Sequence, residues 1–206
     1  MYLVKSNIAL RILYPGRYWK INTSGKKILY LTFDDGPHPD ITPFVLKELR
    51  RYNAKATFFC IGNNVQKYPD IYDRILAEAH TVGNHTFFHR NGWKTNADHY
   101  LEDIDEAYQI ISSNLFRPPY GRMSFAQEKL FKQKYPEKQI IMWDVLSGDF
   151  DTDISWEKCL KNVTSKATAG SIIVFHDSDK AFERLRYALP RTLDHFAELG
   201  FTFRAL

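Results

Sequence analysis

The chain has 206 residues, a length that suits one folded domain, and its 44% hydrophobic and 15% aromatic content excludes an intrinsically disordered chain. The formal net charge is +4 with acidic and basic residues interspersed, so no basic arm for nucleic acid is indicated. Two cysteines, Cys60 and Cys159, do not make a disulfide framework, and we expect both to be buried free thiols.

The N-terminal residues are not expected to form a secretion signal or a membrane-spanning segment. Their apolar run is interrupted by Arg11 and stops at Pro15-Gly16, and no small-residue cleavage site follows. We therefore expect a cytoplasmic protein without a transmembrane segment, with export or peripheral association with the cell envelope left open. Residues 1–25 are predicted to be an extension that packs on a single domain formed by residues 26–206.

Strand-like and helix-like segments alternate along that domain. A capping box at Ser124 and Gln127 marks one helix start, Thr42 is the predicted N-cap of the first helix, and Pro190 is predicted to interrupt the last helix. The expected strands are residues 28–33, 56–61, 81–84, 115–116, 139–143, 171–175 and 201–204, and the expected helices are residues 42–52, 69–79, 97–113, 124–134, 156–168 and 182–199.

This alternation predicts the α/β class with a parallel sheet, and about seven repeats favour a (β/α) barrel over an open sheet. Chemistry in such barrels takes place at the C-terminal ends of the strands. Five short polar motifs fall at or just after predicted strand ends. The fold and the site are therefore predicted from separate features that agree.

Two adjacent acids, Asp34 and Asp35, follow the first predicted strand. Gly36-Pro37 ends the strand, so both carboxylates can turn into one cavity and divide the work between them. The alternative is an ordinary acidic turn, for which Asp-Gly-Pro is suitable.

His85 and His89 stand four residues apart, the spacing that places two imidazoles on one side of a helical turn. Two His and one Asp fill three positions of a tetrahedral zinc site and leave the fourth for water. The alternative is a pair of surface or hydrogen-bonded histidines around two aromatic residues.

Arg117 precedes two prolines that limit where its guanidinium can point. A rigid arginine can keep a neighbouring carboxylate ionised and oriented, although the same residues also suit a plain loop. Gly121 lets the backbone approach a ligand, so the N–H of Tyr120 is a candidate donor to an oxyanion.

His176 ends the apolar run of residues 172–175 and is a candidate general acid, with a hydrogen-bonded core histidine as the alternative. Asp149 can raise the pKa of His176 by charge pairing and keep the imidazole protonated. Asp144 and Asp177 are lesser candidates for that partner. Trp93 is expected in a loop, where it can line a sugar groove.

From about Lys26 onwards the chain resembles the NodB-homology polysaccharide deacetylases, carbohydrate esterase family 4. The motifs occur in the family's order and are Thr32-Phe33-Asp34-Asp35-Gly36-Pro37, His85-Thr86-Phe87-Phe88-His89, Arg117-Pro118-Pro119-Tyr120-Gly121, the segment Trp143 to Phe150, and Val174-Phe175-His176.

The resemblance implies a distorted (β/α) barrel with about seven parallel strands and metal-dependent removal of N-acetyl groups from an N-acetylglucosamine-containing glycan of the peptidoglycan or chitin type. Zinc is the usual ion of the family. By position, Asp34 is the base, Asp35, His85 and His89 are the metal ligands, and His176 is the acid. An O-acetyl esterase, another C–N hydrolase of the superfamily, or a non-catalytic glycan- or metal-binding barrel are the alternatives. The predicted partner is a glycan, and the oligomeric state is left open.

Two motifs depart from the family pattern. The fourth usually reads Asp-x-x-Asp-Trp, whereas Leu146 and Phe150 stand at its first and last positions here. In the fifth, Val174 replaces the usual leucine. Because the residues now at these positions are all apolar, we expect a substrate pocket that is reshaped by Leu146, Phe150 and Val174, with the catalytic residues intact.

Overall fold

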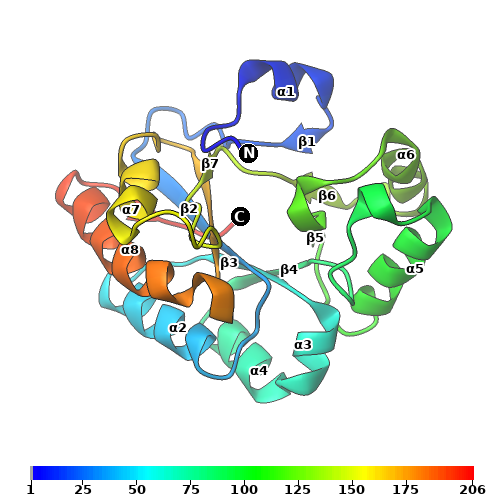
Figure 1. Cartoon of the computed structure of the whole chain (residues 1–206), viewed down its shortest axis with the longest axis horizontal. Coiled ribbons are helices and arrows are strands. Elements are labelled where there is room, and N and C mark those ends of the chain that lie inside the picture. The colour runs from blue at the N-terminus through cyan, green and yellow to red at the C-terminus, as the bar shows by residue number, and fades with distance from the viewer. Residues whose placement is uncertain (1) are drawn as a thin grey trace.

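The structure is a computed structural model that describes residues 2–206. A sheet of parallel strands curves through the middle of the molecule, and helices cover it from the outside (Figure 1). The strands are β1 (Arg17–Tyr18), β2 (Ile28–Asp34), β3 (Thr57–Cys60), β4 (Thr81–Asn84), β5 (Leu115–Phe116), β6 (Gln139–Ile141), β7 (Val145–Leu146), β8 (Ile172–His176) and β9 (Thr202–Phe203).

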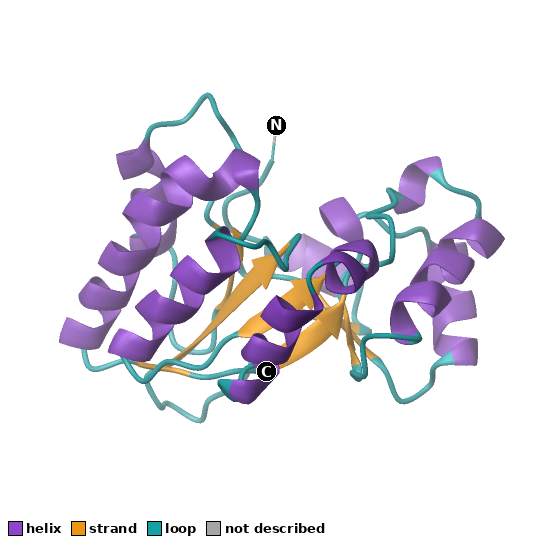
Figure 2. Cartoon of the chain, turned by 90° about the horizontal axis from the view of Figure 1, so that it is seen from below, coloured by secondary structure: helices purple, strands orange, loops and turns teal. Residues whose placement is uncertain are grey.

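The sheet runs in the order β1-β6-β5-β4-β3-β2-β8-β7, and β9 pairs with β2 at the start of that strand. The helices lie on either side of the strands (Figure 2). They are α1 (Ile8–Leu13), α2 (Ile41–Arg51), α3 (Gly62–Lys67), α4 (Pro69–Ala77), α5 (Ala97–Tyr108), α6 (Phe125–Lys134), α7 (Trp156–Thr164) and α8 (Asp179–Glu198), with short 3-10 turns at Gly92–Lys94 and Pro119–Gly121.

The central strands are continuous apolar runs because both of their faces are buried. In β2 the side chains of Leu29, Leu31 and Phe33 are all fully buried, and Phe33 stacks on Phe58 of β3 and on Phe175 of β8. This pattern is typical of parallel strands that helices cover. The predicted parallel α/β barrel is confirmed.

Several predicted elements differ in detail from the observed ones. The capping box at Ser124 is present, but α8 runs unbroken through Pro190, contrary to expectation. A proline removes one helical hydrogen bond, and buried residues on both sides of it, Leu189 and Leu193 among them, hold the two halves against the core. Helix α2 begins at Ile41, so Thr42 lies inside it and is not its N-cap. Strands β1 and β7 and helices α1 and α3 were not predicted.

The N-terminal segment lies across the gap between β7 and β6 (Figure 1). Lys5 forms an antiparallel bridge with Val145 of β7, and β1 pairs in parallel with β6. The two ends of the sheet are thereby joined through residues 4–18. The boundary between extension and domain at residue 25 stays a prediction.

Both cysteines are buried free thiols, as predicted. Among residues 2–206, no helix is long and apolar enough to cross a membrane.

Candidate active site

The five motifs meet at the C-terminal ends of neighbouring strands. Asp34 ends β2, His176 ends β8 directly beside it in the register, and the histidine motif follows β4. The arginine motif follows β5, and Asp149 follows β7. We call this edge of the barrel the catalytic rim.

Asp35, His85 and His89 form a cluster that can hold a metal ion. Oδ1 of Asp35 lies 3.2 Å from Nε2 of His89 and 3.7 Å from Nε2 of His85. Two ligands bound about 2.1 Å from a tetrahedral zinc ion are about 3.4 Å apart, which is close to both distances from Asp35.

The backbone around this cluster is strained. Asp35, Thr86, His89 and Tyr120 all have positive φ, at 80°, 64°, 56° and 59°. Non-glycine residues rarely adopt this conformation, and a β-branched threonine does so least readily. The turn after β4 is held by the side-chain oxygen of Asn84, which accepts a hydrogen bond from the N–H of Thr86 at 2.8 Å. Such strain gathers at functional sites, where the surrounding fold over-determines it.

His85 and His89 do not share a helical turn, which corrects the geometry expected from their spacing. The residues between them form a bend, and the positive φ values of Thr86 and His89 fold the chain back so that both rings face Asp35. The two imidazole centroids are 5.1 Å apart.

The hydrogen bond of His85 fixes the tautomer that a neutral metal ligand needs. Its Nδ1 lies 2.7 Å from the carbonyl oxygen of Arg117. A carbonyl only accepts, so Nδ1 carries the proton and Nε2 presents its lone pair to the cluster. Burial lowers the pKa of His85 to about 4. For Asp35, burial alone favours the protonated form, but the hydrogen bond and charge of His89, with the charges of His176 and His85, hold its pKa well below the usual range.

Asp34 is held by Arg117, whose side chain is completely buried. Nη1 of Arg117 donates to Oδ1 of Asp34 at 2.6 Å and to Oγ1 of Thr32 at 2.7 Å. The other guanidinium nitrogens donate to the carbonyl oxygens of Ile141 and Met142. Burial lowers the pKa of Arg117, an effect that the charge of Asp34 opposes. The guanidinium therefore fixes the orientation of the Asp34 carboxyl group.

His176 is paired with Asp149, which is fully buried. Oδ1 of Asp149 lies 2.7 Å from Nδ1 of His176, and Oδ2 accepts the backbone N–H of His176 at 2.7 Å. Burial works against the charged imidazole, but the charge and hydrogen bond of Asp149, with the charges of Asp35 and Asp34, raise the pKa of His176 to about 10. The paired carboxylate of Asp149 therefore favours the protonated imidazole.

The two lesser candidates for that partner lie elsewhere. Asp144 binds Lys5 and Arg11 of the N-terminal segment, on the side away from the rim. Asp177 follows β8 and accepts a hydrogen bond from the Thr42 hydroxyl, and it lines a hollow beside the metal cluster. Burial raises the pKa of Asp177 to about 8. A Cβ on Gly36 would stand 2.1 Å from Oδ2 of Asp177, so only glycine fits beside this carboxyl group.

Some residues that support the site were not predicted from the sequence. Asn64, on the unpredicted helix α3, donates from its side-chain amide to the carbonyl oxygen of Asp35 at 2.7 Å and supports the strained backbone there. Asn64 lies 29 positions from Asp35, and no local pattern marks it. A hollow beside the cluster is lined by Asp35, Pro37, His38, Asn64, His89 and Ser178, among others.

The remaining predicted site residues differ in how far their side chains are buried. The exposed ring of Tyr120 lies 4.7 Å from that of His89. Leu146 and Val174 are buried register partners on β7 and β8, whereas Phe150 is only partly buried and packs edge-on to His176, with ring centroids 5.2 Å apart. Trp93 is 64% exposed and lies under the guanidinium of Arg122. Roles in oxyanion binding, in the pocket wall and in a sugar groove stay predictions.

Comparisons with known proteins agree with this geometry. Residues 21–134 match the family model described as polysaccharide deacetylase. A peptidoglycan-N-acetylglucosamine deacetylase of Bacillus cereus is 36% identical over 154 residues, which are 72% of this chain and 55% of that protein. A chitooligosaccharide deacetylase of Azorhizobium caulinodans is 33% identical over 168 residues, 75% of this chain and 76% of that protein.

The fold has a solved counterpart over nearly its whole length. A crystal structure of a peptidoglycan N-acetylglucosamine deacetylase superposes with a TM-score of 0.85 at 31% identity, and the match covers 96% of this chain and 94% of that one. The match spans only about half of the Bacillus cereus relative named above.

Proposed function

The chain belongs to the polysaccharide deacetylase family, and from this premise we propose that it is a metal-dependent hydrolase that removes N-acetyl groups from an N-acetylglucosamine-containing glycan. The products are acetate and a glucosamine-type amine. The relatives support a glycan of the peptidoglycan or chitin type.

Asp35, His85 and His89 would hold the divalent cation. Two imidazoles and one carboxylate suit zinc and leave a coordination position open. The chemistry that such a cation supplies is polarisation of the acyl carbonyl and activation of a water molecule.

Asp34 would act as the general base. It lies next to the cluster in sequence, and Arg117 holds one of its oxygens. The guanidinium keeps the carboxylate in place, so its proton-accepting oxygen can face the attacking water. Tyr120, at the edge of the cluster, is the proposed backbone donor to the developing oxyanion.

His176 would act as the general acid. Asp149 occupies Nδ1, so Nε2 is the nitrogen that can donate a proton toward the reacting centre. Amide cleavage expels a poor leaving group, an amine, which needs a proton as the C–N bond breaks. An imidazole held in its protonated form meets that need.

The proposal rests mainly on one observation: a candidate general base and a candidate general acid lie beside the same metal cluster. A carboxylate bound by a buried arginine and a histidine bound by a buried aspartate flank the same three-residue cluster. A barrel that only binds metal or glycan needs neither proton-transfer group. An O-acetyl esterase shares this machinery, although an alcohol leaves with less assistance than an amine.

Acetate release tests the proposal and separates these activities. Enzyme stripped of metal is compared with enzyme given back zinc, on N-acetylglucosamine oligomers, peptidoglycan fragments and acetylated xylan. We expect zinc-dependent release from the N-acetylated substrates. Release from xylan alone would indicate an esterase, and no release from any substrate would indicate a binding protein.

The metal ligands are tested separately by metal content. His85→Ala and His89→Ala are each expected to lose the bound equivalent, because each removes one of three ligands. Retention of a full equivalent with unchanged affinity in both variants would contradict the proposed triad.

A further inference from the structure

The N-terminal segment reaches the catalytic rim. It runs antiparallel to β7: the N–H of Leu146 donates to the carbonyl oxygen of Val4 at 2.8 Å, and the N–H of Ser6 donates to that of Asp144 at 2.9 Å. Strand β7 runs toward the rim, so the antiparallel segment approaches the rim at its beginning. Tyr2 therefore lies beside the loop after β7, which carries Asp149.

Tyr2 is fitted into that loop. A Cβ on Gly148, which has a φ of +80°, would stand 2.7 Å from the Tyr2 hydroxyl oxygen. Burial and the neighbouring carboxylate of Asp151 raise the pKa of Tyr2. The outer end of the phenol group lies against the loop at Gly148, and the backbone of residues 4–6 holds the segment on β7.

The ring of Tyr2 forms the next layer behind the proposed acid. It packs on Phe150 with centroids 5.1 Å apart, and Phe150 packs edge-on to His176 with centroids 5.2 Å apart. Asp149 holds the imidazole ring of His176 through Nδ1. The aromatic contact on the flank of the imidazole therefore limits how far the ring can swing about its hydrogen bond.

We propose that Tyr2 is a positioning residue of the active site, which holds Phe150 against His176 and so keeps Nε2 of His176 directed at the leaving group. This inference rests on the proposed function for its kinetic consequence. It also gives the N-terminal segment a role beyond joining the edges of the sheet: the segment supplies an inner wall of the catalytic rim.

The test compares Tyr2→Ala with the neighbouring control Leu3→Ala, because Leu3 is 55% exposed on the same segment. We expect Tyr2→Ala to lower kcat roughly ten- to a hundredfold with KM within about twofold, since misplacing a catalytic group by about 1 Å can cost 10²-fold. Tyr2→Phe keeps the ring and should retain kcat within about threefold. Leu3→Ala should behave as wild type.

Two further measurements separate positioning from folding. In the Tyr2→Ala background, Phe150→Trp should restore part of kcat, because the larger ring refills the space behind the imidazole. The NMR signals of the His176 ring, assigned by their loss in His176→Gln, should shift in Tyr2→Ala and not in Leu3→Ala.

The outcomes are distinguishable from those of the proposed function. If the wild type releases no acetate, the proposed function fails, while the NMR comparison still decides the role of Tyr2. Wild-type kcat and unshifted His176 signals in Tyr2→Ala would overturn the inference. An equal loss in Leu3→Ala would also overturn it, because the effect would then come from general disturbance of the segment.

Discussion

The two ends of the barrel use similar residues for opposite purposes. At the catalytic rim, the side chains of Asp35, His85 and His89 converge on one point that can hold a metal ion, and the backbone there is strained. At the opposite end, acids and bases neutralise each other directly. The charge of Asp144 is met by Lys5 and Arg11, and the Ser171 hydroxyl donates to it as well.

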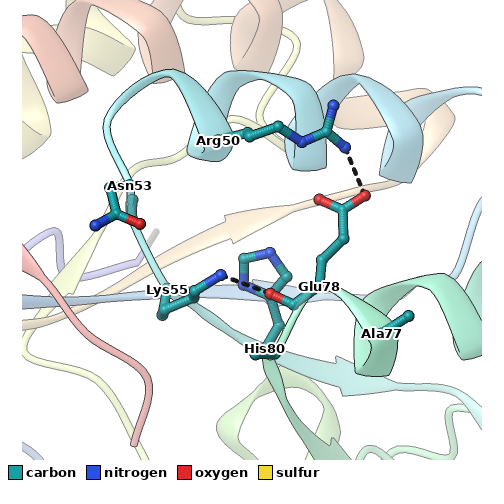
Figure 3. A pocket seen from close by; sticks show the side chains of 8 residues that line it. Arg50, Asn53, Lys55, Ala77, Glu78 and His80 are labelled. Atoms are coloured by element: carbon teal, nitrogen blue, oxygen red, sulfur yellow. Dashed lines mark hydrogen bonds and ion pairs between the residues drawn. The ribbon is translucent and has the colours of Figure 1, made fainter.

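A hollow at that opposite end shows the same contrast (Figure 3). Glu78 binds Arg50, and its carbonyl oxygen accepts the ammonium group of Lys55 at 2.6 Å. Nδ1 of His80 accepts the N–H of Ala56 at 3.1 Å. Here the polar groups lie where α2 and α4 end and where β3 and β4 begin, and they form hydrogen bonds and ion pairs with one another. At the rim, by contrast, the side chains of the metal cluster are arranged to bind a ligand. Residue type alone therefore does not identify which end of the barrel is the catalytic rim.

The largest expected effect concerns proton transfer at the rim. Asp34→Asn and His176→Ala should each keep the metal and lose most turnover, by about 10²–10⁴ in kcat, because each removes a general base or acid. Acetate release and metal content measure the two properties. Asp179→Asn, which changes an exposed acid near the same rim, serves as control. Near-normal turnover in either variant would refute the assigned roles.

The corresponding change at the opposite end should affect stability. Asp144→Ala leaves Arg11 and Lys5 without their buried partner and should lower the free energy of unfolding by about 3 kcal/mol. Glu183→Ala breaks an exposed pair with Arg186 and should cost under about 1 kcal/mol. Urea denaturation measures both. Equal small losses would mean that Asp144 does not hold the N-terminal segment.

His80 should make stability depend on pH at the opposite end. Burial lowers its pKa to about 4, so the folded state favours the neutral ring. The unfolded state then binds more protons between about pH 6.5 and pH 4, and this contribution to stability, present above pH 6.5, is lost as the pH falls. The loss is up to about 3 kcal/mol. His80→Asn keeps an acceptor for Ala56 and should flatten this part of the stability profile; an unchanged slope would contradict the assignment.

The smallest expected effect concerns substrate preference, and it distinguishes a partly buried residue of the rim from a fully buried one. Phe150→Trp changes a partly buried ring beside His176 and should alter the ratio of kcat/KM between N-acetyl and N-propionyl substrates about tenfold, as apolar pocket changes of roughly 1–3 kcal/mol do. Val174→Leu enlarges a fully buried side chain and should mainly cost stability, about 1–3 kcal/mol. Equal scaling for both acyl groups in Phe150→Trp would show that it only packs the barrel.

Periodicity and the position of polar motifs were enough to predict much of the molecule. Parallel strands buried on both faces appear as apolar runs, and a barrel places the chemistry at their C-terminal ends. Asp34, Arg117 and His176 therefore stood out before their contacts were known. The predicted partnership of Asp149 with His176 agrees with their 2.7 Å contact.

The tertiary structure decided what depends on distant contacts. The folding back of residues 85–89 requires left-handed backbone at Thr86 and His89, which residue spacing does not indicate. Pro190 stays within α8 because packing on both sides outweighs one missing hydrogen bond. Asp144 and Asp149 are five positions apart and were both candidates for the same role, yet the strand between them sends one to each end of the barrel. Tyr2 carries no sequence signal of function, because its place beside Phe150 follows from an antiparallel pairing of Lys5 with Val145, 140 positions away in the chain.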